Sequence, residues 1–296
     1  MDLSVIIVTH DSRAFIDACL ASVGATLREF DGAAAESSEV CVVDNQSSDG
    51  TADAVRSAHP WARLVESGTN GGFAHGVNLG LAYTSGAFVL WLNPDARFLA
   101  GAGSGLREVL AWMAEHPRAG IVGGRMFDPG GGVQRSARTF PSYGAVLGAR
   151  YSALTRFWPG NPFSRRFLRA DLTYDCVATV DWVSGACLLH RRAVSDELRG
   201  LDEGFFMYFE DVDFCYRARQ AGWTTHFHPG FSVDHHIGGS SEQVPLRMLA
   251  ARHRSMWRWY TKHFARFWLK DVVVFTGIQI RCGWLMLSRL WRRRAR

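Results

Sequence analysis

Short apolar runs alternate with helix-like segments over the first 127 residues of the chain. Runs rich in Val, Ile and Leu predict strands, and the segments between them carry apolar residues at helical spacing. The predicted strands are 3–9, 40–44, 62–66, 88–92 and 120–127, and the predicted helices are 13–25, 51–58, 77–84 and 103–116. This alternation predicts an α/β fold: a Rossmann-like, mostly parallel sheet flanked by helices. Ligands of such sheets bind at the carboxyl ends of the strands.

The pattern changes after residue 127. Gly and Pro interrupt residues 128–174 repeatedly, which predicts a long irregular region and a candidate site for an acceptor. Further along the chain, regular structure is expected at 179–190, a helix up to about residue 221, strands at 224–228 and 231–235, and a helical extension at 243–265 and 267–292. We therefore expect one domain over 1–240, composed of the segments 1–127 and 128–240, followed by C-terminal helices over 241–296.

Composition narrows the class of protein. Hydrophobic residues make up 47% of the chain and charged residues 21%, which is typical of a globular protein. The six cysteines form no CxxC pair, which argues against a zinc site and a disulfide framework and favours buried, reduced thiols. An apolar strand begins at residue 3 with no basic segment before it, so we expect no cleaved signal peptide and a cytoplasmic catalytic part.

Charge divides the chain unevenly. Residues 241–296 carry 13 Lys and Arg against two acids, whereas residues 1–240 carry 20 Lys and Arg against 26 acids. An acidic body with a basic tail is not the usual pattern of a nucleic-acid-binding protein, and it favours a tail that contacts an anionic surface.

Two acids follow predicted strands. Asp44 ends the strand at 40–44, where its carboxylate could recognise a nucleobase or ribose, or form a turn that caps the next helix. Asp95 follows the apolar strand 88–92 within Asn93-Pro94-Asp95. A carboxylate held there could bind a divalent cation, although Asn-Pro-Asp is also a common turn sequence.

A cluster of acids lies beside aromatic residues later in the chain. Glu210 and Asp211 follow the run Phe205–Phe209, where loss of water and mutual repulsion would raise their pKa values into the range of a general base. Capping of the following helix is the alternative. His235 and His236 end a strand and point to opposite faces, so only one of them can face the ligand crevice.

Taken together and in order, these motifs resemble glycosyltransferase family 2, which has the GT-A fold. The matching stretches are Ser4–Thr9, Val42–Thr51, Asn70–Asn78, Leu92–Asp95, Trp182–Ala186, Phe209–Arg217 and His235–Ser240. The Asn-Pro-Asp form of the metal motif and the stretch Gln134–Pro141 are similar to the rhamnosyltransferase branch of that family.

The resemblance implies an inverting transfer from a nucleoside-diphosphate sugar, assisted by a divalent metal, Mn²⁺ or Mg²⁺. It implies that Asp211, paired with Glu210, is the catalytic base, and that Asp95 and His235 hold the metal. His235 is chosen by its spacing to Gly238 and Ser240. The residues implied to bind substrate are Thr9, Asp44, Asn70, Gly71, Asn93, Trp182 and Arg217, where Arg217 would face the diphosphate or brace the acids.

The expected donor is dTDP-rhamnose, and the expected acceptor is a hydroxyl of a glycan or polyprenyl-linked saccharide in cell-envelope polysaccharide synthesis. A UDP- or GDP-sugar donor, or a degenerate membrane-docked scaffold, is the alternative. A nicotinamide-dependent oxidoreductase and a P-loop NTPase are disfavoured, because GxGxxG is missing after the first strand and GxxxxGK[ST] is absent.

The C-terminal helices suggest where the protein acts. In the last helix, Lys270, Arg281 and Arg292 are spaced to lie on one face of an otherwise apolar segment. Its longest uncharged stretch, Val272–Ile280, is too short to span a bilayer. The pattern predicts a helix lying in the headgroup plane of an anionic membrane, on the inner face of the plasma membrane, with a homodimer interface as the alternative.

Overall fold

The computed structural model describes residues 3–32, 38–141, 158, 161–169, 171–236 and 245–294. Its first half contains β1 (Leu3–Thr9), α1 (Arg13–Asp31), β2 (Ser38–Asp44), α2 (Thr51–Ala58), β3 (Arg63–Glu66), α3 (Phe73–Ala82), β4 (Phe88–Leu92), β5 (Ala96–Phe98), α4 (Ala102–Glu115) and β6 (Ala119–Phe127). Its second half contains β7 (Ala137–Arg138), α7 (Pro162–Phe167), β8 (Ala178–Val180), β9 (Trp182–Val183), β10 (Cys187–Arg191), α8 (Arg192–Leu198), α9 (Glu210–Gln220), β11 (Thr224–His235), α10 (Pro245–His263) and α11 (Trp268–Arg294).

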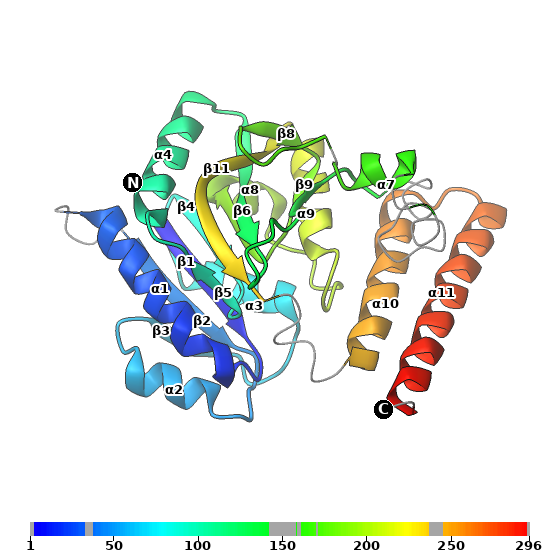
Figure 1. Ribbon diagram of the computed structural model, residues 1–296, viewed down its shortest axis with the longest axis horizontal. Helices are drawn as coiled ribbons and strands as arrows, with labels where there is room; N and C mark the ends of the chain where they lie inside the picture. The colour runs from blue at the N-terminus through cyan, green and yellow to red at the C-terminus, as the bar shows by residue number, and fades with distance from the viewer. Residues whose placement is uncertain are drawn as a thin grey trace.

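The described strands form a nine-stranded mixed sheet (Figure 1). Its strand order is β3-β2-β1-β4-β10-β6-β11-β5, with β8 also paired to β11. Strands β3, β2, β1 and β4 are parallel, whereas β10 runs antiparallel between β4 and β6. The carboxyl ends of the parallel strands therefore meet at one edge, where Thr9 and Asp44 end β1 and β2.

Helices cover both faces of the sheet, because alternate strand residues point to opposite sides. Leu3, Val5 and Ile7 of β1 pack with α1, α2 and α4 on one face. Ile6 and Val8 pack with α3, α8 and α9 on the other face. These two apolar layers hold the strands in register and confirm the expected α/β fold.

The structure corrects several expected boundaries. The helix expected at 13–25 continues to Asp31, and the helix expected at 77–84 begins at Phe73. The two strands expected at 224–228 and 231–235 form one strand, β11, with a register shift between Phe227 and Ser232. All six cysteines are free; five are buried and Cys176 is exposed.

Helices α10 and α11 form a pair beside the sheet domain (Figure 1). Trp259 of α10 is buried and belongs to the apolar cluster that also contains residues of α3 and α9. The expected boundary at 240/241 lies outside the described residues.

Candidate active site

Asp44 and Thr9 lie together at the ends of β2 and β1. The parallel register pairs the two residues, and Thr9 Oγ1 donates to Asp44 Oδ1 at 3.0 Å. The hydroxyl and the backbone N–H of Ser47 also donate to the Asp44 carboxylate, at 2.5 and 2.9 Å. Asp44 therefore forms the expected turn, and that turn holds its buried carboxylate at the carboxyl edge of the sheet.

The glycine-rich loop before α3 touches the segment that leads to the predicted acids. Asn70 Oδ1 accepts a hydrogen bond from the N–H of Gly72 at 3.2 Å, and Gly71 packs against the ring of His75. Gly72 has φ +88°, and a Cβ there would lie 2.1 Å from the carbonyl oxygen of Phe206. Only glycine allows this approach. The loop that carries Asn70 and Gly71 is thus fixed against Phe206.

Asp95 and His235 are brought together by a strand that the sequence analysis missed. The turn at Asn93 is followed directly by β5, which pairs antiparallel with β11 so that Ala96 lies opposite His235. As a result, Asp95 Oδ1 lies 3.5 Å from His235 Nε2, and both side chains are largely buried. The neighbouring His236 instead packs near Phe15, at 5.8 Å between ring centroids.

Gln134 determines which His235 nitrogen faces Asp95. Its Nε2 donates to the backbone carbonyls of His235 (2.6 Å) and Phe127 (3.1 Å), so its Oε1 must be the acceptor that lies 3.0 Å from His235 Nδ1. Nδ1 is therefore the N–H donor, and in the neutral imidazole Nε2 carries the lone pair that faces Asp95.

The residues present fit a divalent cation. An imidazole lone pair facing a carboxylate is a donor set that suits Mn²⁺, and the Gln134 amide is the kind of partner that orients metal-binding histidines. Among the described residues, no group of three or more His, Cys, Asp or Glu side chains has metal-binding geometry. Donor phosphates and water would complete the coordination, as they commonly do for Mg²⁺. The motif residues 237–240, Gly238 and Ser240 among them, lie outside the described residues.

Glu210 and Asp211 begin α9, where Glu210 is buried and Asp211 is half-buried. Burial and the neighbouring Asp211 charge raise the pKa of Glu210 well above its usual value. Its Oε2 is buried and has no hydrogen-bond partner in the described part of the chain. Burial also raises the pKa of Asp211, but the N–H groups of Gly185 (2.9 Å) and Val212 (2.8 Å) donate to its carboxylate and oppose that rise.

The two carboxyl groups therefore differ in their preferred charge. The N–H groups of Gly185 and Val212 and the positive charge of Arg138 stabilise a negative Asp211, whereas Glu210 has only its own backbone N–H as a donor and its Oε2 has no partner in the described part of the chain. When the pair holds one proton, that proton belongs on Glu210 and the charge on Asp211. Gly185 lies close against Asp211, because a Cβ there would be 3.2 Å from Asp211 Cβ, a tight contact.

Two of the residues expected to bind substrate make contacts within the protein. Nε of Arg217 donates to Asp213 at 2.7 Å, and its terminal nitrogens donate to the carbonyls of Leu198 and Gly200. These contacts match the bracing role rather than a diphosphate contact. Trp182 of β9 is buried, and its indole Nε1 donates to the carbonyl of Thr139 at 2.9 Å, so its side chain packs against the residues after β7.

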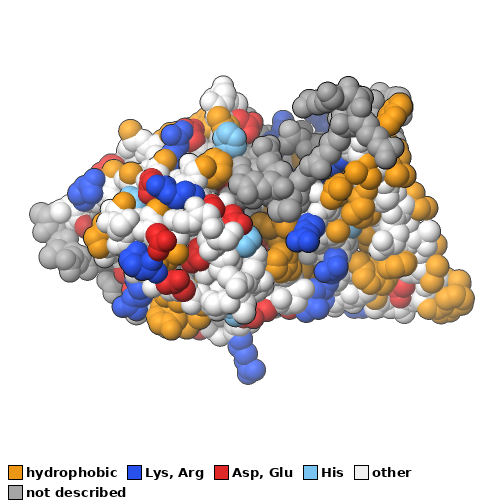
Figure 2. All heavy atoms as spheres, turned by 90° about the horizontal axis from the view of Figure 1, so that it is seen from below, with side chains coloured by type: hydrophobic (Ala, Val, Ile, Leu, Met, Phe, Trp, Pro, Cys, Tyr) orange, Lys and Arg blue, Asp and Glu red, His pale blue; other side chains and the backbone are white. Residues whose placement is uncertain are grey.

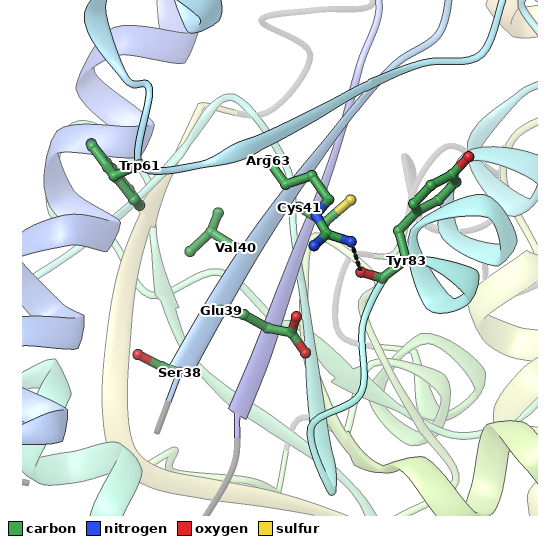
Figure 3. A pocket seen from close by; sticks show the side chains of 7 residues that line it. All are labelled: Ser38, Glu39, Val40, Cys41, Trp61, Arg63 and Tyr83. Carbon is green, nitrogen blue, oxygen red and sulfur yellow. Dashed lines mark hydrogen bonds between the residues drawn. The ribbon is translucent and has the colours of Figure 1, made fainter. Parts of the chain in front are cut away.

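The open pocket shown in Figure 3 lies away from these residues. It has a volume of about 340 Å³ and is lined by residues such as Ser38 and Cys41, near the amino ends of β2 and β3. Its charged groups already have partners, since Glu39 accepts from Ser85 and Gly86, and Arg63 donates to the carbonyl of Tyr83. We therefore place the active site at the carboxyl edge instead.

Fold and site together define a GT-A glycosyltransferase. Residues 4–194 match the family described as Glycosyl transferase family 2, and the chain belongs to that family. The fold is shared with the mannosyltransferase PcManGT from Pyrobaculum calidifontis, solved with GDP-Man and Mn²⁺. The TM-score is 0.58 at 19% identity, over 90% of this chain and 64% of that one. S. aureus TarS, solved with UDP-GlcNAc, matches with a TM-score of 0.54 at 20% identity, over 86% of this chain and 65% of that one.

Curated relatives are similar over different lengths. The N-acetylglucosaminyl-diphospho-decaprenol L-rhamnosyltransferase of Mycobacterium tuberculosis is 32% identical over 99% of this chain and 96% of its own length. Rhamnosyltransferase WbbL of Escherichia coli is 40% identical over 57 residues, which cover 19% of this chain and 22% of that protein.

The charge assignment for the acid pair can be tested by infrared spectroscopy. Because burial and the Asp211 charge raise its pKa well above the usual value, Glu210 should give a protonated carboxyl C=O band near neutral pH. The band should disappear in Glu210→Gln and persist in Asp211→Asn. The assignment is wrong if the band is lost only in Asp211→Asn.

Proposed function

We propose that the protein transfers L-rhamnose from dTDP-rhamnose to a sugar hydroxyl of a polyprenyl-diphosphate-linked saccharide, with inversion, in cell-envelope polysaccharide synthesis. The observation that supports it most directly is the acid pair beside the glycine-rich loop, in a chain similar over nearly its whole length to a decaprenol-linked L-rhamnosyltransferase. A UDP- or GDP-sugar is the alternative donor.

The proposed chemistry follows from the charges at the site. A sugar hydroxyl is a poor nucleophile at neutral pH, so the ionised Asp211 accepts its proton while the hydroxyl oxygen attacks the anomeric carbon. The bond between that carbon and the diphosphate breaks, and the diphosphate leaves from the opposite side. A single displacement inverts the anomeric centre, and no covalent sugar intermediate is required.

The remaining site residues bind and orient the donor in this proposal. Asp44, oriented by Thr9 and Ser47, contacts the nucleoside, and the turn at Asn93 lines the same edge. Asp95 and His235 Nε2 hold a divalent metal, which supplies positive charge to the diphosphate leaving group when bound.

Replacement of the base tests the reaction. With dTDP-rhamnose and a synthetic polyprenyl-diphosphate-GlcNAc acceptor, Asp211→Asn should lower kcat by about 10²–10⁴-fold, because the amide cannot accept a proton. Donor affinity, measured by calorimetry, should change little. Normal transfer by Asp211→Asn together with an inactive Glu210→Gln would assign the base to Glu210. If the wild-type chain neither transfers sugar nor binds a sugar nucleotide, the alternative of a degenerate membrane-docked scaffold would be supported.

Metal binding can be measured without turnover. Mn²⁺ titration followed by electron paramagnetic resonance should show one site that Asp95→Ala or His235→Ala abolishes. Gln134→Leu should weaken the affinity by about 10–100-fold, because His235 loses the acceptor that orients it. Gln134→Glu keeps an acceptor and serves as the matched control. Unchanged Mn²⁺ affinity in Asp95→Ala would exclude this site, and EDTA should abolish transfer if the metal acts in catalysis.

We further propose that α11 lies on an anionic membrane at the cytoplasmic face. The charged stripe expected to face the headgroups is only partly exposed. Lys270 is exposed, but Arg281 is partly buried on the side of α10, near Ile278 and Cys282. The opposite side of α11 is an exposed apolar face at helical spacing: Leu269, Val273, Ile280, Trp284, Leu287 and Trp291. Figure 2 shows hydrophobic side chains gathered at this end of the molecule, beside blue Lys and Arg.

Contacts with α10 favour a helix in the headgroup plane over a spanning helix. An 18-residue window within residues 268–291 of α11 has a mean hydropathy of 1.2, so by length and composition this helix could cross a bilayer, contrary to the expectation from the uncharged stretch alone. However, Asp271 accepts a hydrogen bond from the hydroxyl of Tyr260 at 2.7 Å, and α11 lies along a helix rich in Arg. Exposed Arg266 and Lys270 flank the apolar face and complement anionic lipid.

Removal of α11 should separate membrane binding from folding. Full-length protein should sediment with phosphatidylglycerol vesicles, less so in high salt and less so with phosphatidylcholine, because basic side chains assist the apolar contact. Truncation after Arg266 retains α10 and should release the protein. Equal sedimentation with and without α11 would refute the proposal, and a lipid-independent dimer that needs α11 would assign the apolar face to a second copy.

A further inference from the structure

A backbone of unusual conformation leads directly into the acid pair. Tyr208 and Phe209 have φ angles of 68° and 70°, and Phe209 is the residue immediately before α9. Bulky aromatic residues rarely adopt this left-handed conformation, and two in succession persist only where surrounding contacts hold them. The position of Glu210 and Asp211 therefore depends on whatever holds this turn.

Helix α10 supplies those contacts. Ser255 Oγ donates to the carbonyl of Met207 at 2.8 Å. The buried Trp259 ring lies 6.0 Å from the ring of Phe209, and the guanidinium of Arg252 lies 5.8 Å from the ring of Tyr208. Contacts from one helix thus reach three consecutive residues of the strained turn.

Charges fix α10 to both sides of the same turn. Asp213, one turn into α9, is fully buried and accepts hydrogen bonds from His263 Nε2 (2.7 Å) and Lys262 Nζ (3.0 Å). Asp202, before the turn, binds Lys262 and Arg258, each at 2.7 Å. Lys262 therefore bridges residues on either side of the segment 203–212.

These contacts favour the charged forms of Asp202 and Asp213. Burial alone would raise the pKa of Asp213, but bonds from His263 and Lys262 and the charge of Arg217 lower it. Burial would likewise raise the pKa of Asp202, but bonds from Lys262 and Arg258 lower it to about 2. Removing Lys262 would take one partner from both acids at once and leave the buried Asp213 charge less compensated, so the helix and the turn are coupled.

We propose that α10 is a clamp that positions the catalytic acids, with Ser255, Trp259, Lys262 and His263 as positioning residues. The inference rests on the proposed function, since it assigns the clamp's effect to the base of that reaction. None of these four side chains touches Asp211 in the described contacts, so they act through the turn at 207–209 and through Asp213.

Full-length variants test the clamp by two independent measurements. Ser255→Ala removes one hydroxyl, and Lys262→Met removes the bridge between Asp202 and Asp213 while keeping an unbranched side chain. Arg254→Met is the matched control, because Arg254 is exposed on the same helix and loses the same charge. Amide hydrogen exchange over residues 207–213 should speed up by about tenfold or more in the first two variants and stay unchanged in the control.

Kinetics then separate positioning from loss of fold. In Ser255→Ala and Lys262→Met, kcat should fall by up to about 10²-fold. The donor affinity measured by calorimetry and the Tm of the protein should stay close to the wild-type values. If Lys262→Met fails to fold, Ser255→Ala alone decides the question. Wild-type exchange and wild-type kcat in both variants would overturn the clamp. A wild-type chain without transferase activity would instead refute the proposed function, and the exchange measurement would still test the clamp.

Discussion

The adjacent carboxyl groups of Glu210 and Asp211 impose the main constraint on this structure. Two carboxylates side by side and shielded from water repel each other, so the pair can be buried only if the environment distinguishes its members. Backbone N–H groups of Gly185 and Val212 stabilise charge on Asp211, whereas Glu210 Oε2 has no hydrogen-bond partner in the described part of the chain. Asp211, which is half-buried, is thereby favoured to stay ionised beside the buried Glu210.

The segment before the acids is held from several sides for the same reason. Asn78 of α3 exchanges hydrogen bonds with the backbone of Leu201, and Arg217 of α9 donates to the carbonyl of Gly200. Phe206 meets the glycine-rich loop, and α10 holds the residues that follow. The Asn70–Asn78 motif thus has a structural role. Gly72 allows the close approach of Phe206, and the hydrogen bonds of Asn78 fix the backbone at Leu201.

The sequence predicted what depends on local pattern and missed what depends on distant contacts. Strand-end acids such as Asp44 were predictable, because an apolar run followed by polar residues is visible in one dimension. The pairing of Ala96 with His235 was not, because a three-residue strand has no detectable period. Gln134 lay within a motif already noted, but its role required knowing that it meets a residue 101 positions away. For the same reason, the basic tail was predicted as a surface feature, whereas Lys262 binds buried acids.

The order of the helices links the proposed membrane surface to the proposed chemistry. Helix α10 contacts the turn before the acids on one side and α11 on the other. If α11 lies on the bilayer as proposed, α10 sets the separation between lipid and base by the thickness of one packed helix, about 10 Å. A flexible linker would leave that distance variable. An acceptor anchored by its lipid presents its hydroxyl at a limited range of heights, so a rigid spacer suits this reaction better than a tether does.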